Sequence, residues 1–133
     1  MIQESFWQRI ALGQAAWQMF QTAPLFGVGL GNFIARLPAF LTPERFYFLQ
    51  PVHNIFLLLL TETGLFGLCL VADRGWRIFK KVWSEKNRPL LAAFLAIVFT
   101  GLFDHYWLTL AQGQLLLALI VGLALKAKNE KSG

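Results

Sequence analysis

The chain has 133 residues, of which 56% are hydrophobic and only 14% are charged, whereas about 25% of the residues in an ordinary soluble domain are charged. Because the apolar residues occur in long blocks, this composition excludes an ordinary soluble domain and favours an all-α integral membrane protein. The single cysteine, Cys69, excludes an intrachain disulfide and a cysteine-based metal cluster. The first ten residues, MIQESFWQRI, lack the basic and apolar regions of a signal peptide.

Residues 1–51 are predicted to form an outer region that begins with an amphipathic helix. The apolar residues of ESFWQRIALGQAAWQMFQTA recur near the 3.6-residue helical period: Phe6, Ile10, Trp17 and Phe20. Ser5 followed by Gln8 fits a capping box at the start of this helix, and Pro24 is expected to end it. We expect the helix to lie at the membrane interface or to pack against the membrane region.

A glycine-rich loop follows the predicted helix, with Gly27, Gly29 and Gly31 spaced as G-x-G-x-G. A dinucleotide-binding fingerprint would need a preceding strand and a βαβ unit, and no parallel-sheet pattern occurs in this chain. Two interpretations stay open, a purely structural turn and a nest of backbone N–H groups that binds an anion. Two short helical pieces are expected next, the second starting at Thr42-Pro43-Glu44.

Three apolar segments, at about 52–72, 89–103 and 106–125, predict three transmembrane helices within residues 52–126. The second is short for a full crossing and would need flanking residues or a thinner bilayer. Nine of the twelve basic residues lie in the predicted loop 73–88 and in Lys126 with the tail 127–133. The positive-inside rule makes these segments cytoplasmic, and it places residues 1–51 and the hairpin Asp104–His105 outside.

The loop 73–88 interleaves Trp76, Phe79 and Trp83 with arginines and lysines. This pattern is typical of a segment at a membrane surface, and anionic lipid headgroups account for it without nucleic acid as a partner.

Two polar residues stand out in the first apolar segment, LQPVHNIFLLLLTETGLFG. Glu62 costs at least about 2.5–3.5 kcal/mol at mid-membrane unless it has a partner, and Gln112 and Gln114 of the third segment are candidates. Its role is either helix packing or chemistry. His53 stands at the outer edge of its helix, where an imidazole is either an interfacial polar group or a general base.

Asp104 and His105 are residue types expected in a short exposed turn. The chain has no H-x-x-x-H or D-x-D spacing, so we predict neither a metal site nor a cofactor.

Two elements in order resemble the O-antigen ligase and O-antigen polymerase family. Arg9 precedes the element PLFGVGLGNF, and the element HNIFLLLLTETGLFG opens a membrane helix. The late stretch GLFDHYWLTLAQGQLL is also similar to the end of such proteins. The resemblance implies a mostly helical, GT-C-like glycosyltransferase of the bacterial inner membrane. Such an enzyme transfers a glycan from a polyprenyl-diphosphate carrier, without a metal, to an acceptor sugar hydroxyl at the outer face during lipopolysaccharide or other envelope polysaccharide synthesis.

The resemblance also implies roles for individual residues. His53 would be the general base or the group that orients the hydroxyl, and Arg9 would neutralise the leaving diphosphate. Residues expected near the carrier are Gly27, Gly29, Gly31, Asn32 and Asn54, whereas Glu62 would support helix packing. Because family members have many more membrane helices, we expect a C-terminal portion whose partner is the remaining membrane part. The alternatives are a small non-enzymatic membrane subunit, or a transporter fragment in which Glu62 and His53 relay protons.

Overall fold

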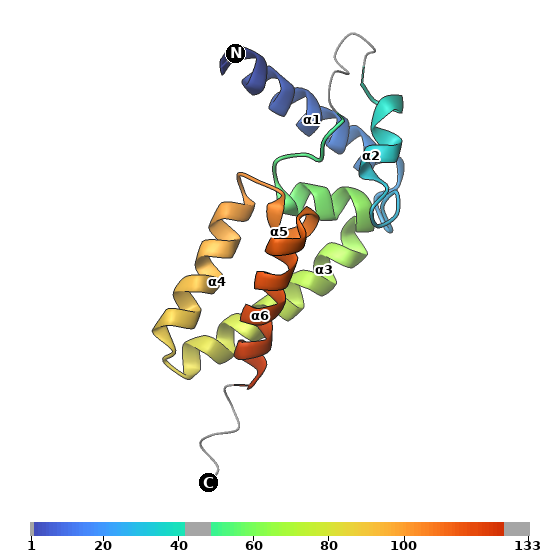
Figure 1. The fold of residues 1–133 in the computed structure, drawn as a ribbon. Helices are drawn as coiled ribbons and strands as arrows, with labels where there is room; N and C mark the ends of the chain where they lie inside the picture. Colours follow the sequence, from blue (N-terminus) through green and yellow to red (C-terminus); the bar gives the residue numbers. More distant parts are fainter. Residues whose placement is uncertain (1, 42–48, 127–133) are drawn as a thin grey trace.

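The computed structural model describes residues 2–41 and 49–126, with side chains described from residue 6 onward. Within these residues the chain is all-helical and has no strand (Figure 1), which confirms the predicted all-α class. The elements are α1 (Ile2–Thr22), α2 (Phe33–Arg36), the 3₁₀ helix η1 (Leu37–Ala39), α3 (Ile55–Ser84), α4 (Arg88–Gly101), α5 (Tyr106–Thr109) and α6 (Ala111–Lys126). The start predicted at Thr42-Pro43-Glu44 lies outside the described residues.

The longest element, α3, has 30 residues, or about 45 Å at 1.5 Å per residue. Among the described helices it is the one long and apolar enough to cross a membrane, and α4 and α6 are shorter apolar helices. The predicted loop 73–88 is largely wrong, because α3 continues to Ser84 and the turn to α4 occupies residues 85–87 alone. The prediction failed because charged residues mark the end of the apolar stretch and not the end of the helix. Arginine and lysine are good helix formers, so the helix continues through them.

The third predicted membrane helix is broken. Leu110 adopts an extended conformation (φ −100°, ψ 134°) between α5 and α6. Gly113 allows the two helices to fold together closely, since a Cβ there would lie 2.3 Å from the Tyr106 carbonyl oxygen. The Gln114 side chain donates to the Leu108 carbonyl (2.6 Å), which satisfies one of the acceptors left by the break.

The second half of α3 packs beside α4 and α6, and the helix ends meet at two levels (Figure 1). At the level of the α3–α4 turn, Val82, Leu90 and Ala124 form a buried cluster. At the opposite level, the Asn54 side-chain amide donates to the carbonyl of Leu102 (3.1 Å). Asn54 therefore ties the start of α3 to the end of α4.

α1 packs on α3 through a different face from the predicted one. The buried residues of this core cluster are Leu12, Ala15, Ala16, Met19, Phe33, Leu37, Val52 and Leu58. Phe6 and Trp17, expected on the packed face if α1 lay against the membrane region, are instead 60% and 50% exposed. Small residues let two backbones approach closely, and the Thr61 hydroxyl donates to the Ala16 carbonyl at 3.2 Å. Because α1 begins at Ile2, the helix start predicted at Ser5 lies inside the helix.

Candidate functional site

The glycine loop and the kink in α3 complete one another's backbone hydrogen bonds. Gly64 has non-helical angles (φ 66°, ψ −168°) inside α3, so two carbonyls before it and two amides after it lose their helical partners. The loop pairs with all four groups: Val28 N–H donates to Thr61 O (2.9 Å), Gly29 N–H to Glu62 O (2.9 Å), Leu65 N–H to Pro24 O (2.9 Å) and Phe66 N–H to Leu25 O (3.1 Å). We call this pairing of residues 24–29 with 61–66 the clasp.

Glycine is required in the clasp by close backbone approach. A Cβ on Gly27 would lie 2.3 Å from the Glu62 carbonyl carbon, and one on Gly64 would lie 2.4 Å from that of Leu25. Both residues also have positive φ, which other residues rarely adopt. These contacts favour the structural interpretation of the glycine loop over the anion nest.

Several polar groups that were expected to face the carrier are occupied within the protein. Gly27 N–H donates to the carbonyl of Ala23 (2.8 Å), and Gly29 N–H is used in the clasp. The Asn32 side chain donates to Val28 O (3.2 Å), while Gly31 has open space around its α-carbon. Of this group, Gly31 keeps the most room for a ligand.

Glu62 is half-buried, and its carboxylate accepts a hydrogen bond from the backbone N–H of Phe33 (3.1 Å) at the start of α2. The anticipated pairing with Gln112 or Gln114 is wrong, because Gln112 is exposed and Gln114 binds Leu108. The carboxylate thus fixes the short helix that follows the glycine loop. This is a packing role, although the partner lies in the outer region rather than in the third apolar segment.

His53 lies immediately before the cap of α3. The Asn54 side-chain oxygen Oδ1 accepts from Leu57 N–H (2.9 Å), an N-cap bond, and its side-chain Nδ2 donates to the carbonyl of Leu102. Asn54 therefore uses both ends of its side chain to position the backbone beside His53. The imidazole is half-buried, and its Nδ1 is buried with no hydrogen-bond partner.

The turn between α4 and α5 brings Asp104 and His105 to His53. The two imidazole rings meet edge to face with centroids 5.3 Å apart, and His105 is buried at 8% exposure rather than displayed on an exposed turn. His105 Nδ1 lies 2.6 Å from the Thr109 hydroxyl. That hydroxyl donates to the His105 carbonyl (3.1 Å), so it can accept a hydrogen bond from the Nδ1–H tautomer of His105.

Asp104 holds the turn and faces the second ring nitrogen. Its carboxylate accepts from His105 N–H (2.7 Å) and lies 3.9 Å from His105 Nε2. Donor atoms of His53, Asp104 and His105 lie within 4.8 Å of one another, so among the described residues these three could hold a metal ion. Sequence spacing missed this group because His53 lies far along the chain from Asp104 and His105. That the chemistry needs no metal stays a prediction.

The electrostatic environment favours the neutral form of both histidines. Burial lowers the pKa of His53 below its usual 6.5, the nearby Arg9 guanidinium and His105 lower it further, and Asp104 opposes them. Burial also lowers the pKa of His105, again against Asp104. The exposed Arg9 of α1 therefore lies near enough to His53 to influence its charge. A neutral imidazole with a vacant lone pair can accept a proton.

Comparison with protein-family models gives one match, described as O-antigen ligase, over residues 3–72 of the 133. The chain belongs to the O-antigen ligase family. No curated protein and no solved structure matches it. The part matched to O-antigen ligase contains Arg9, both backbone segments of the clasp, His53 and Glu62. Asp104 and His105 lie beyond it. Sequence reasoning missed Thr109, whose only signal is its helical i+4 spacing from His105.

Proposed function

We propose that this O-antigen ligase family chain takes part in transferring a glycan from a polyprenyl-diphosphate carrier to a sugar hydroxyl, with His53 as the general base. The observation that carries the proposal is the packing of His53 against His105 and Asp104, with Arg9 of α1 near enough to lower the pKa of His53. A cation beside a neutral base is the pair that a displacement with an anionic leaving group requires.

In the proposed step, the acceptor hydroxyl gives its proton to a ring nitrogen of His53 as its oxygen attacks the anomeric carbon of the donor glycan. The bond between that carbon and the diphosphate oxygen breaks, and its electron pair leaves with the diphosphate. Arg9 neutralises the developing charge, since a guanidinium can bind two phosphate oxygens at once and keeps its charge.

His105 and Asp104 position the base in this proposal. His105 is fixed by Thr109 and packs its ring against His53. Asp104 opposes the loss of a proton from both rings, so it stabilises the imidazolium that forms when the hydroxyl is deprotonated. The Asn54 cap fixes the backbone next to His53, and the clasp fixes the glycine loop against α3.

The site is proposed to lie at the outer face of the bacterial inner membrane, with the α3–α4 turn and the end of α6 on the cytoplasmic side. Support comes from the distribution of basic residues, which gather at that turn. In this arrangement α3, α4 and α6 cross the bilayer, and further membrane helices complete the carrier groove.

The test uses membranes from cells that express the chain at matched levels, supplied with a polyprenyl-diphosphate-linked glycan and a core-sugar acceptor. Removing a general base typically costs about 10²–10⁴-fold in rate, so His53→Ala and His53→Gln should lower transfer by that amount. Lys126→Gln, at the far end of α6, should leave the rate unchanged. Unaltered transfer by both His53 variants would sink the assignment.

A further inference from the structure

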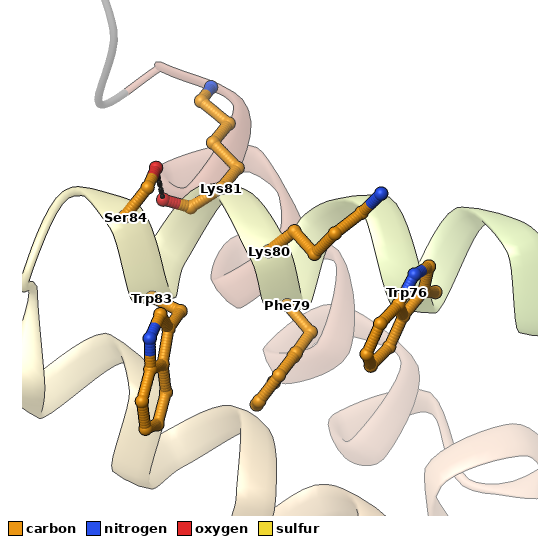
Figure 2. Close-up of a pocket in the computed structure, with 6 residues that line it drawn as sticks. All are labelled: Trp76, Phe79, Lys80, Lys81, Trp83 and Ser84. Atoms are coloured by element: carbon orange, nitrogen blue, oxygen red, sulfur yellow. Dashed lines mark hydrogen bonds between the residues drawn. The ribbon is translucent and has the colours of Figure 1, made fainter.

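The last turns of α3 carry an open groove that the proposed reaction does not use. Its lining residues are Trp76, Phe79, Lys80, Lys81, Trp83 and Ser84, and its volume is about 780 Å³ (Figure 2). It lies in the last turns of α3, whereas His53 precedes the first turn of that helix (Figure 1). The groove is therefore a second place where this chain could hold a ligand.

Aromatic rings form the wall of the groove. Figure 2 shows Trp76, Phe79 and Trp83 projecting from the same side of α3. Phe79 stacks on Trp76 with centroids 5.5 Å apart and lies 5.8 Å from Trp83, while Phe94 of α4 contacts it at 6.2 Å. The two indoles stay 57% and 62% exposed. Exposed indoles beside a membrane helix are typical of the level where lipid headgroups meet acyl chains.

Basic side chains surround this wall. The stretch 73–88 with Lys126 has seven basic residues and two acidic ones: Arg74, Arg77, Lys80, Lys81, Lys86, Arg88 and Lys126 against Asp73 and Glu85. Asp73 is taken by Arg77 (2.8 Å), and no carboxylate among the described residues lies within ion-pair distance of Lys80. The Lys80 amine sits 5.8 Å from the centre of the Trp76 ring, at the rim of the groove.

Lys81 has a structural task as well as a charge. Its amine donates to the Leu125 carbonyl (2.5 Å) in the last turn of α6, where a cation also complements the helix dipole. Lys80 is therefore the cation that stays available to an anionic ligand, and Lys81 fixes α6 beside the groove.

The aromatic wall continues toward the middle of α3 as an uncharged track. Leu65, Cys69 and Ala72 precede Trp76 at three- and four-residue spacing on the same helix face, and all three are exposed. From Leu65 to Trp83 the track is about 27 Å long at 1.5 Å per residue. A soluble phosphate or a nucleic acid would leave this apolar length uncovered, whereas an acyl chain would cover it.

We propose that the groove binds an anionic phospholipid, with the phosphate at Lys80, Trp83 at the headgroup level, and an acyl chain along Phe79, Trp76 and the uncharged track that precedes them. Charge complementarity selects the headgroup, and the apolar track selects a lipid over other phosphate compounds. The site fixes the depth of α3 in the bilayer through one bound lipid.

The test is quenching of tryptophan fluorescence by brominated lipid in detergent micelles of the full chain. Trp7, Trp17 and Trp107 are replaced by phenylalanine so that Trp76 and Trp83 report. Brominated phosphatidylglycerol should quench at about fivefold lower mole fraction than brominated phosphatidylcholine, because one basic residue near an anionic surface contributes about 1 kcal/mol. Lys80→Gln should equalise the two lipids, and Arg36→Gln, on the exposed helix α2, should leave the preference intact.

Native mass spectrometry of the chain with all its tryptophans provides a second measurement, which does not depend on the triple variant folding. It should retain one phosphatidylglycerol in preference to phosphatidylcholine, and Lys80→Gln should abolish the preference. Equal quenching and equal retention of the two lipids by the unaltered groove would overturn the proposal. Displacement of the lipid by inorganic phosphate or by a short single-stranded DNA at equal concentration would overturn it too.

Discussion

At the residue scale, Glu62 shows how a costly carboxylate is accommodated in an apolar segment. The kink at Gly64 turns this part of α3 toward the glycine loop, and the side chain accepts from Phe33 N–H. A carboxylate near the start of a helix is also favoured by the helix dipole. Glu62 therefore connects the clasp to the short helix α2.

Replacement of Glu62 should separate hydrogen bonding from charge. Glu62→Ala removes the acceptor and leaves the Phe33 amide unpaired, which should lower the free energy of unfolding by about 1–3 kcal/mol. Glu62→Gln keeps a carbonyl acceptor and should cost well under half of that. Thermal unfolding followed by circular dichroism in detergent checks both variants.

The same pair of variants tests the proton-relay alternative. In proteoliposomes, Glu62→Gln should not alter proton uptake if the carboxylate is a packing group. Uptake that disappears in Glu62→Gln while folding is retained would favour the transporter interpretation instead.

Sequence reasoning identified the chemical residue types but not their partners. Glu62 was expected to need a hydrogen bond, which it has, but a backbone amide donates it. His53 and His105 are separated in the sequence by the two helices α3 and α4, so only the packing of the α4–α5 turn against the start of α3 brings their rings together. Periodicity within one helix carries no information about such a meeting.

At the element scale, the clasp explains why the chain carries two separate glycine-containing elements. A helix broken at Gly64 would expose four backbone groups, and the loop of residues 24–29 satisfies each of them. The loop in turn gains a fixed conformation. Each element is thus incomplete without the other. In the sequence, one element precedes His53 and the other follows it.

Substituting glycines should show this dependence directly. Gly27→Ala forces a Cβ against the Glu62 backbone at a positive φ, and it should destabilise the protein by more than about 2 kcal/mol. Gly13→Ala, inside α1 with nothing within 4 Å of the new Cβ, should instead stabilise it by up to about 1 kcal/mol. Equal effects of the two substitutions on the unfolding midpoint would contradict the clasp.

The sequence predicts some elements well and others poorly for identifiable reasons. The end of α1 lies close to the expected position because Pro24 is a local signal, and α4 (Arg88–Gly101) lies close to the predicted apolar segment 89–103. The extension of α3 to Ser84 was missed because hydropathy reports membrane depth rather than helix length. The kink at Gly64 was missed because its stabilising partner lies in a distant loop.

At the scale of the whole molecule, the proposed site and the basic groove occupy opposite ends of the helices (Figure 1). Such a separation suits a protein that works at one membrane face and is anchored at the other. α4 has 14 residues and is about 21 Å long, less than the hydrocarbon thickness of about 30 Å, so a thinner bilayer or flanking residues would be needed around it.

Labelling of single cysteines tests the proposed sidedness. In a Cys69→Ser background, Ala35→Cys on exposed α2 and Ser84→Cys at the end of α3 report the two ends. An impermeant maleimide should label Ala35→Cys in intact spheroplasts, and it should label Ser84→Cys only after lysis. Labelling of both positions from the same side would contradict the topology.

The most direct test of the central claim is the pH dependence of kcat/KM for glycan transfer. A neutral His53 must accept a proton, so the rate should fall at acid pH through a pKa below the usual 6.5. Arg9→Gln removes a charge that lowers this pKa, so the acid limb should move to higher pH. Asp104→Asn removes a charge that raises it, and the limb should move to lower pH. An acid limb that stays in place in both variants, or shifts in the same direction in both, would contradict His53 as the base.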